Sequence, residues 1–136
     1  IYRYFLSTNT RLSVPVGEEI LFLQSYIYLL QIRFEDVLKI NINGNIDIQK
    51  QIIPVSIQLL IENAIKHNVA SVEHPLIVDV NIFAENIEVV NNLQLRLNVE
   101  KSGHGLSNLQ KQYALYNKKI EVSKTKGHFG VQVPYL

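Results

Sequence analysis

The segment Leu59-Leu-Ile-Glu-Asn-Ala-Ile-Lys-His-Asn68 decides how this chain folds, because its residues repeat with the period of a helix. Asn63, Lys66 and His67 lie at i, i+3 and i+4 and share one face of that helix. An amide oxygen suits Mg²⁺, and Lys and His side chains donate hydrogen bonds to phosphate oxygens. An ordinary solvated polar face has the same pattern, so the spacing alone leaves both alternatives open. The other face is apolar and is predicted to be buried through Ile57, Leu60, Ile61, Ala64 and Ile65.

The composition of the chain limits its class. Its 136 residues, 47% of them hydrophobic, predict one globular domain that buries about two-thirds of its unfolded surface. A net charge of +1 argues against nucleic acid as the main partner. The absence of cysteine excludes a disulfide framework and a thiolate zinc site, and fits a reducing compartment. No apolar run is long enough to span a membrane, and no signal peptide is visible.

A long helix is predicted before the central segment. Glu18 and Glu19 follow the breaker sequence Ser13-Val-Pro-Val-Gly17 and place negative charge where a helix N-terminus favours it. An apolar seam with 3-4-3-4 spacing then runs through the helix, and Phe22, Tyr26 and Leu29 widen it. This seam fits packing on the same domain and a dimer contact about equally well. Its residues are Ile20, Leu23, Ile27, Leu30 and Phe34.

The remaining segments predict a mixed sheet. Residues 38–43 alternate as a half-buried strand, and residues 76–91 indicate a hairpin with its turn at 84–86. A helix is expected at 105–116, and two strands at 119–122 and 129–133. The predicted fold is a two-layer α/β sandwich, in which helices cover one face of a mixed β-sheet and an N-terminal helical segment precedes it.

Gly103-His104-Gly105 directly precedes the residues of that third helix. Glycines let the backbone approach phosphate, and a helix N-terminus supplies free N–H groups and the positive end of the helix dipole. A lone Gly-x-Gly is more often a plain turn, so it gains weight only from its context. His74 and His128 lie beside turn residues and receive no role. The lysines at 118, 119, 124 and 126 are interpreted as solvated surface.

Three motifs carry a resemblance to a known family. Leu-Ile-Glu-Asn-Ala-Ile-Lys-His resembles the N-box of the GHKL ATPase superfamily, in the form found in LytS-like sensor histidine kinases. Residues 103–109 resemble that family's Gly-x-Gly-Leu-x-Asn box. Glu19, Tyr26 and Arg33-Phe34 match its Glu…Tyr…Arg-Phe pattern. The resemblance covers nearly the whole chain and implies the histidine kinase-like ATPase fold with a Bergerat-type ATP site.

The resemblance also assigns roles. Residues 1–36 would end the dimerisation and phosphoacceptor region and include a connecting helix, and residues 37–136 would form the ATP-binding catalytic domain. Asn63 would ligate Mg²⁺, and Lys66 and His67 would neutralise the ATP phosphates. Glu62 is a candidate general base that polarises the acceptor imidazole, although pairing with Lys66 at i+4 is equally compatible. ATP would lie between the N-box helix and the glycine turn, where the second box supplies Gly103, Gly105, Leu106 and Asn108.

The implied reaction extends beyond this chain. The γ-phosphoryl group would pass to a His upstream and then to a response regulator. Residues 1–10 contain no phosphoacceptor motif and no initiator Met, so we expect a piece of a longer protein. The resemblance implies that this longer protein is a homodimer. The resemblance implies a cytoplasmic domain whose parent is membrane-anchored. The chain has no Met, and its approach to the N-box is one residue shorter than the family's Ile-Pro-Pro-x-x-x-Gln. We hypothesise that modified methionines are missing from the sequence, which a mass above 15.6 kDa would reveal.

Two departures keep other functions open. Asn91 stands where the family has the Asp that accepts a hydrogen bond from the adenine amino group, and Leu93 replaces the first Gly of that box. An Asn oxygen still accepts, without the charge of a carboxylate. The alternative is a degenerate, non-catalytic module that acts through dimer or partner contacts. An ATP-hydrolysing relative is disfavoured, because Leu59 occupies the position of the Glu that would activate water.

Overall fold

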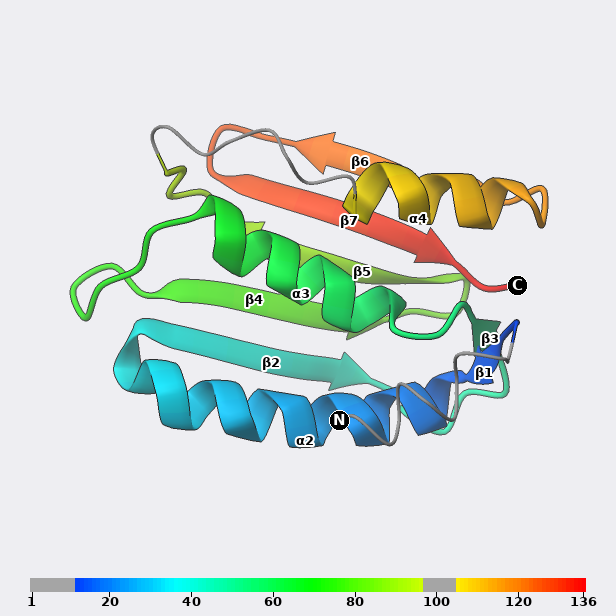
Figure 1. The fold of residues 1–136 in the computed structure, drawn as a ribbon, viewed down its shortest axis with the longest axis horizontal. Coiled ribbons are helices and arrows are strands. Elements are labelled where there is room, and N and C mark those ends of the chain that lie inside the picture. The colour runs from blue at the N-terminus through cyan, green and yellow to red at the C-terminus, as the bar shows by residue number, and fades with distance from the viewer. Residues whose placement is uncertain (1–11, 97–104) are drawn as a thin grey trace.

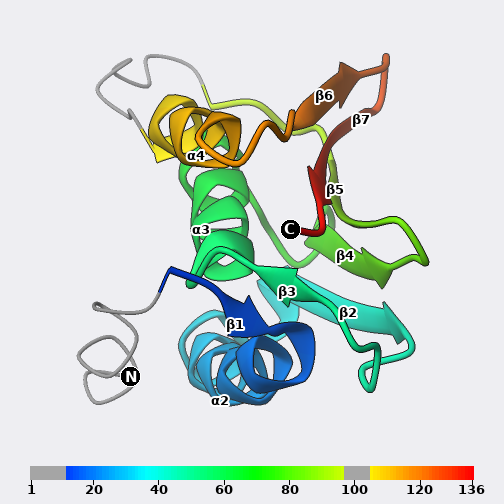
Figure 2. The ribbon, with the colours of Figure 1, turned by 90° about the vertical axis from the view of Figure 1, so that its right-hand side faces the viewer.

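The computed structural model describes residues 12–96 and 105–136. Helices cover one face of a five-stranded sheet there (Figures 1 and 2), as the two-layer prediction required. The helical elements are α2 (Val16–Phe34), the 3₁₀ turn η1 (Glu35–Val37), α3 (Ser56–His67) and α4 (Gly105–Ala114). The strands are β1 (Val14–Pro15), β2 (Leu38–Gly44), β3 (Gln51–Ile52), β4 (Leu76–Ile82), β5 (Asn86–Asn92), β6 (Glu121–Lys124) and β7 (His128–Pro134).

The sheet has the order β2-β4-β5-β7-β6 and is mixed. β2 pairs with β4 in parallel, whereas the other neighbours are antiparallel. Parallel neighbours need a crossover connection, and α3 lies within that crossover. β4 and β5 form the predicted hairpin. Their side chains alternate strictly, so that one face packs under the helices through Leu76, Val78, Val80, Ile82, Ile87 and Val89.

The apolar seam of α2 packs on the chain's own core. Ile20 and Leu23 are fully buried, and the later residues Ile27, Leu30 and Phe34 pack against the same core. Leu29, which was expected to widen this seam, is 49% exposed and lies outside that core, because it faces away from the sheet. This burial confirms that the seam packs on its own domain, and a dimer contact through its partly buried residues stays a prediction. α2 thus belongs to the core that the sheet and α3 build. A domain boundary at residue 36 stays a prediction.

The N-terminus of α3 is capped from α2. Val55, in the shortened approach to this helix, has φ 67° and forms no side-chain cap. Instead, the carboxylate of Glu19 accepts hydrogen bonds from the backbone N–H groups of Val55, at 3.0 Å, and Ile57, at 3.4 Å. Glu19 is only 1% exposed. A carboxylate at this point satisfies free N–H groups and meets the positive end of the helix dipole, which fixes where α3 begins.

A buried tyrosine fastens α4 to the same region. The hydroxyl of Tyr113 accepts a hydrogen bond from the backbone N–H of Ile53, at 3.1 Å, and lies 2.9 Å from Oγ of Ser56. Ser56 in turn donates to the carbonyl of Ile53, at 2.6 Å. Burial, the largest cause, raises the pKa of Tyr113 from 10.0 to about 12. The protonated hydroxyl is therefore part of the folded state.

This pKa predicts a loss of stability in alkali. A tyrosine whose pKa is higher in the folded state adds stability that is complete below its unfolded pKa of 10.0 and disappears as the pH rises towards about 12. Two pKa units correspond to about 2 to 3 kcal/mol. Urea unfolding across this window should show a steep decline for the wild type and a shallower one for Tyr113→Phe. Equal slopes for the two proteins would contradict this role of Tyr113.

Two details of the sheet differ from the sequence-based expectation. β6 spans Glu121–Lys124 rather than residues 119–122, because pairing with β7 begins at Glu121, while Ile120 already belongs to the core. The short antiparallel pair of β1 and β3 was not predicted. Strands of two residues leave no periodic signal in a sequence.

Candidate functional site

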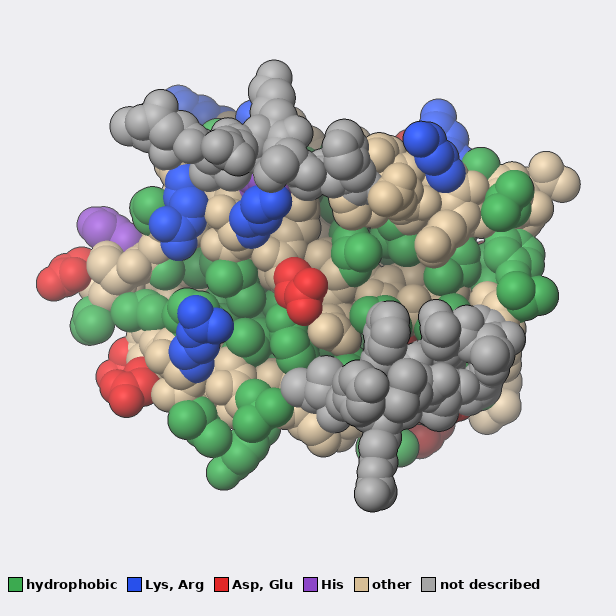
Figure 3. All heavy atoms as spheres, in the orientation of Figure 1, with side chains coloured by type: hydrophobic (Ala, Val, Ile, Leu, Met, Phe, Trp, Pro, Cys, Tyr) green, Lys and Arg blue, Asp and Glu red, His purple; other side chains and the backbone are tan. Residues whose placement is uncertain are grey.

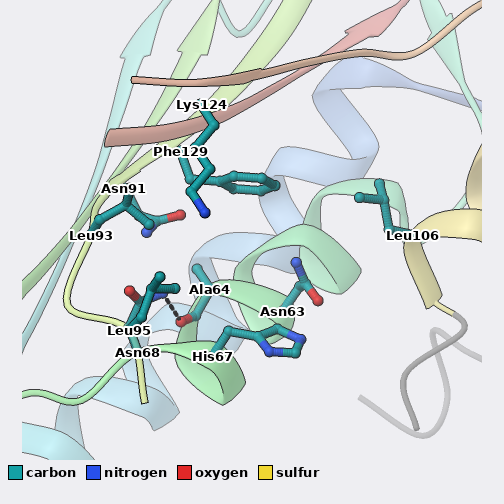
Figure 4. A pocket seen from close by; sticks show the side chains of 10 residues that line it. All are labelled: Asn63, Ala64, His67, Asn68, Asn91, Leu93, Leu95, Leu106, Lys124 and Phe129. Carbon is teal, nitrogen blue, oxygen red and sulfur yellow. Dashed lines mark hydrogen bonds between the residues drawn. The ribbon is translucent and has the colours of Figure 1, made fainter. Parts of the chain in front are cut away.

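A pocket of about 320 Å³ lies beside α3, where β5 and β6 end and where β7 and α4 begin. This volume lies at the lower end of the roughly 300–1,000 Å³ range of ligand sites. Its described lining combines apolar and polar side chains, none of them acidic (Figure 4). The lining residues are Asn63, Ala64, His67, Asn68, Asn91, Leu93, Leu95, Leu106, Lys124 and Phe129.

α3 contributes one wall of this pocket. Asn63 and His67 are half-buried and lie one turn apart on the helix face that borders the cavity, with Ala64 beside them (Figure 4). Lys66 is exposed and is not among the described lining residues. The structure therefore brings two of the three predicted polar residues together at the pocket. The apolar face of the same helix is buried as predicted, through Ile57, Leu60, Ile61 and Ala64.

Asn91 forms part of the pocket on the sheet side. The alternation of β5 places it on the buried face, after Ile87 and Val89, and it is only 3% exposed. Its amide nitrogen donates to the carbonyl of Asn92, at 2.9 Å. The amide oxygen is therefore directed into the cavity (Figure 4), where it acts as a hydrogen-bond acceptor. A polar acceptor on an otherwise apolar strand face is the kind of group that orients a ligand.

Asn68, which sequence reasoning left without a role, fastens the pocket's rim. Its amide nitrogen donates to the carbonyl of Ala64, and its oxygen accepts from the N–H of Gln94, both at 2.8 Å. The adjacent backbone adds hydrogen bonds from Val69 to Gln94 and from Arg96 to His67. The segment that carries the pocket residues Leu93 and Leu95 is thus held against the end of α3.

Three further lining residues, Leu95, Lys124 and Phe129, were not identified from the sequence. Phe129 of β7 pairs in register with Asn91 of β5 and with Lys124 of β6, so the three side chains share one face. Lys124 is exposed, as expected of a surface lysine, yet its side chain also borders the pocket (Figure 4). Strand register brings these residues together, and the sequence offered no signal for that register.

Glu62 lies on another face of α3. Tyr26 donates to its Oε1 from α2, at 3.1 Å, and the amide of Gln58 donates to the same oxygen, at 3.0 Å. Burial and then the charge of Glu62 raise the pKa of Tyr26, so its hydroxyl remains a donor. Glu62 is exposed and does not line the pocket.

The second glycine box is described in part. Gly105 and Asn108 lie in the first turn of α4 but outside the pocket lining, whereas Leu106 lines it. Gly103 lies outside the described residues. Gly105 packs closely against Leu59 of α3, since a Cβ there would lie 3.4 Å from Leu59 Cδ2. The two boxes therefore meet where α3 and α4 face each other.

The lining defines the chemistry that the pocket can perform. Apolar side chains suit a flat aromatic base, while Asn63, His67 and Lys124 suit an anionic group. Within residues 12–96 and 105–136, no group of three or more His, Cys, Asp or Glu side chains could hold a metal ion. A divalent cation held by one amide oxygen is consistent with Mg²⁺, which keeps several waters and takes further ligands from substrate phosphates.

Comparisons with known proteins identify relatives along most of the chain. It is 30% identical over 130 residues to the sensor protein kinase HptS of Staphylococcus aureus (strain USA300), which corresponds to 95% of this chain and 23% of that protein. The chain therefore spans about a quarter of the length of this relative. No protein-family model matches the chain.

Solved structures share the fold. The cytoplasmic segment of histidine kinase QseC aligns with a TM-score of 0.58 at 19% identity, covering 91% of this chain and 76% of that one. The catalytic domain of histidine kinase ThkA aligns with a TM-score of 0.58 at 16% identity, covering 90% and 94%. No helix of the described residues is long and apolar enough to cross a membrane. The chain is therefore homologous to part of a sensor protein kinase and has the fold of histidine kinase catalytic domains.

Proposed function

We propose that this chain is the ATP-binding catalytic domain of a LytS-like two-component sensor histidine kinase. Its substrate would be ATP with Mg²⁺, and the γ-phosphoryl group would pass to a His of the parent protein and then to a response regulator. The observation that carries the proposal is the convergence of Asn63, His67 and Asn91 on one pocket, in a chain homologous to a sensor protein kinase. The described residues that line this pocket include no acidic side chain.

Adenine recognition would rest on Asn91 and the apolar lining. A purine base fits a cavity lined by Leu93, Leu106 and Phe129. The amide oxygen of Asn91 would accept a hydrogen bond from the exocyclic amino group of adenine. Guanine carries a carbonyl oxygen at the equivalent position, so two acceptors would face each other in a buried site. This contact would make the pocket selective for adenine.

Asn91 provides the test of base recognition. We expect an ATP analogue to bind at least about tenfold more tightly than the GTP analogue, because an unmet buried acceptor costs about 1 to 3 kcal/mol. Asn91→Leu, which is similar in volume, should remove this preference. Asn43→Leu, at an exposed position of β2, is the matched control. Calorimetric titration measures the ratio of the ATP-analogue and GTP-analogue affinities in each variant. An unchanged preference for the ATP analogue in Asn91→Leu would contradict the role of Asn91 in adenine recognition.

The phosphates would be bound at the α3 side of the pocket. Asn63 would hold Mg²⁺ through its amide oxygen, while His67 and Lys124 would donate hydrogen bonds to phosphate oxygens. Lys66 and the second glycine box, including Gly103, Gly105 and Asn108, would add donors on the phosphate side. The metal ion would neutralise phosphate charge. Positioning and electrostatic stabilisation would then supply most of the catalysis.

Glu62 is the proposed general base for the acceptor imidazole. The hydrogen bonds from Tyr26 and Gln58 both reach Oε1. They would fix the carboxylate so that Oε2 accepts the imidazole proton as the phosphoryl group arrives. The acceptor His would belong to the parent protein, a homodimer that we propose to be membrane-anchored with this domain in the cytoplasm. Nucleic acid and the membrane are not among the partners proposed for this domain.

One observation favours a second candidate. Leu93 lines the pocket at the position where the family motif has its first glycine. A pocket narrowed by this side chain could belong to a degenerate module that retains the fold and acts through protein contacts. Such a module would bind neither ATP nor GTP analogues measurably, so the titration that tests Asn91 separates the two candidates.

A further inference from the structure

α2 carries a second apolar stripe that faces away from the core. Leu21, Ser25, Tyr28 and Ile32 follow one another at 4-3-4 spacing, and Leu29 lies beside them. We call these five residues the outer seam. Leu21 is 64% exposed, Tyr28 68% and Ile32 60%. The spacing is that of the contact positions of a coiled coil, which pack into a neighbouring helix. The apolar seam of Ile20, Leu23, Ile27, Leu30 and Phe34 already packs on the core. Among the described residues, the outer seam is therefore left to face solvent.

The outer seam includes one projecting side chain, Tyr28, and an open groove beside Ser25. An open groove of about 640 Å³ is lined by Leu21, Gln24, Ser25, Tyr28 and Leu29. Ser25 is the small residue of the stripe and leaves room in the groove, while Tyr28, one turn further along, stands out from the surface. Figure 3 shows hydrophobic side chains gathered along the edge where the C-terminal half of α2 runs. The side chain of Tyr28 can therefore pack on the open groove beside Ser25 of another copy.

We propose that α2 of a second copy of this chain occupies this groove, antiparallel and related by a two-fold axis. In this arrangement Leu21 faces Ile32 of the other copy, and Ser25 faces Tyr28 of the other copy. Each Tyr28 ring then fills the hollow above the opposite Ser25. A parallel pairing would instead oppose two Tyr28 rings and two Ser25 side chains, which leaves one layer crowded and another empty.

Charge favours the same orientation. The first turn of α2 carries the half-buried Glu18, and its last turn carries the exposed Arg33. Glu19 is buried as the cap of α3 and takes no part in this contact. Antiparallel pairing brings the acidic end of one helix near the basic end of the other. It also aligns the two helix dipoles in opposite directions. The outer seam itself contains no charged residue that pairing would bury.

The size of the seam sets the strength of the contact. The exposed parts of its large side chains amount to on the order of 500 Å² per copy, compared with about 800 Å² in a stable interface. We therefore expect weak association of the isolated chain, with a dissociation constant of about 0.1 to 1 mM. In a dimeric parent protein, the two copies of this domain would be tethered to each other. The tether would raise the effective concentration of one α2 helix for the other and make their contact persistent. The pairing itself does not depend on nucleotide binding.

Disulfide cross-linking tests the orientation directly, because the chain contains no cysteine. Leu21→Cys and Ile32→Cys are made on two chains of different size, and the chains are oxidised separately and as a mixture. Antiparallel pairing predicts rapid formation of the mixed 21–32 disulfide, at least about tenfold faster than either homodimer. Leu115→Cys, at an 85% exposed position of another surface, gives the rate of random collision.

Sedimentation equilibrium provides the second readout. Tyr28→Ser should weaken self-association at least about tenfold, whereas Leu115→Ser should leave it unchanged. Both positions are exposed, so thermal melting should show that both variants remain folded. Predominant 21–21 and 32–32 disulfides would overturn the antiparallel arrangement. A monomer at millimolar concentration, with all cross-links no faster than those of Leu115→Cys, would assign the seam to another protein or segment and overturn the proposal.

Discussion

Asn63→Ala is expected to abolish the Mg²⁺-dependent part of nucleotide binding. Asn63 is half-buried at the pocket and would supply the only protein oxygen that we assign to the metal ion. Its removal should weaken binding of a non-hydrolysable ATP analogue about tenfold or more with Mg²⁺ present, and little with EDTA. In the full-length protein, phosphoryl transfer to the acceptor His should fall about 100-fold or more, because positioning and charge stabilisation supply most of the rate.

The matched control for this variant is Asn43→Ala. Asn43 is an exposed amide on β2 that donates to Asn81, on the sheet rather than at the pocket. Both variants should melt within a few degrees of the wild type. The comparison separates metal binding from stability, since only Asn63→Ala should change the dependence on Mg²⁺. Equal binding by Asn63→Ala and wild type at every Mg²⁺ concentration would remove Asn63 from the site.

Glu19→Ala is expected to destabilise the fold by about 3 kcal/mol. The substitution leaves the N–H groups of Val55 and Ile57 without their carboxylate acceptor and opens a cavity where a fully enclosed side chain was. For a domain of this size the melting temperature should fall by about 10 °C. Glu19→Gln should recover part of the loss, because its single amide oxygen can still accept from one of the two N–H groups.

The exposed loop residue Glu73 provides the control for that measurement. Glu73→Ala removes the same charge from the chain and should change the melting temperature by no more than about 2 °C. Because α3 carries both Asn63 and His67, Glu19→Ala should also weaken nucleotide binding in the remaining folded protein. A melting temperature of Glu19→Ala equal to that of Glu73→Ala would show that the cap does not determine the start of α3.

Periodic patterns in the sequence predicted most of the architecture. The helical period of residues 57–65 predicted α3 and its buried face. The alternation of residues 76–91 predicted the β4–β5 hairpin, in which Asn91 lies on the buried side. The capping of α3 by Glu19 was not predictable in this way. It depends on how α2 crosses the start of α3, which is a tertiary contact between residues 36 positions apart.

The lining of the pocket was predictable where one element supplies neighbouring side chains. Asn63 and His67 follow from helical spacing, and they meet Asn91 and Leu106 at one pocket. Sequence reasoning missed Asn68, because its contact with segment 93–96 depends on the path of that segment. It also missed Lys124 and Phe129, because the register between β6 and β7 places them at the pocket. Lys66 shows the limit of the spacing argument. Residues at i+3 and i+4 lie on either side of a helix's central line, and here only the i+4 residue borders the cavity.

Calorimetric titration of this chain with a non-hydrolysable ATP analogue and Mg²⁺ tests the central claim most directly. We predict binding of one nucleotide per chain with a dissociation constant of about 1 μM to 1 mM. This affinity should decrease in Asn63→Ala and in Asn91→Leu. A folded wild-type chain that releases no heat at analogue concentrations well above millimolar would contradict the account. It would identify the chain as a module that retains the kinase fold without binding ATP.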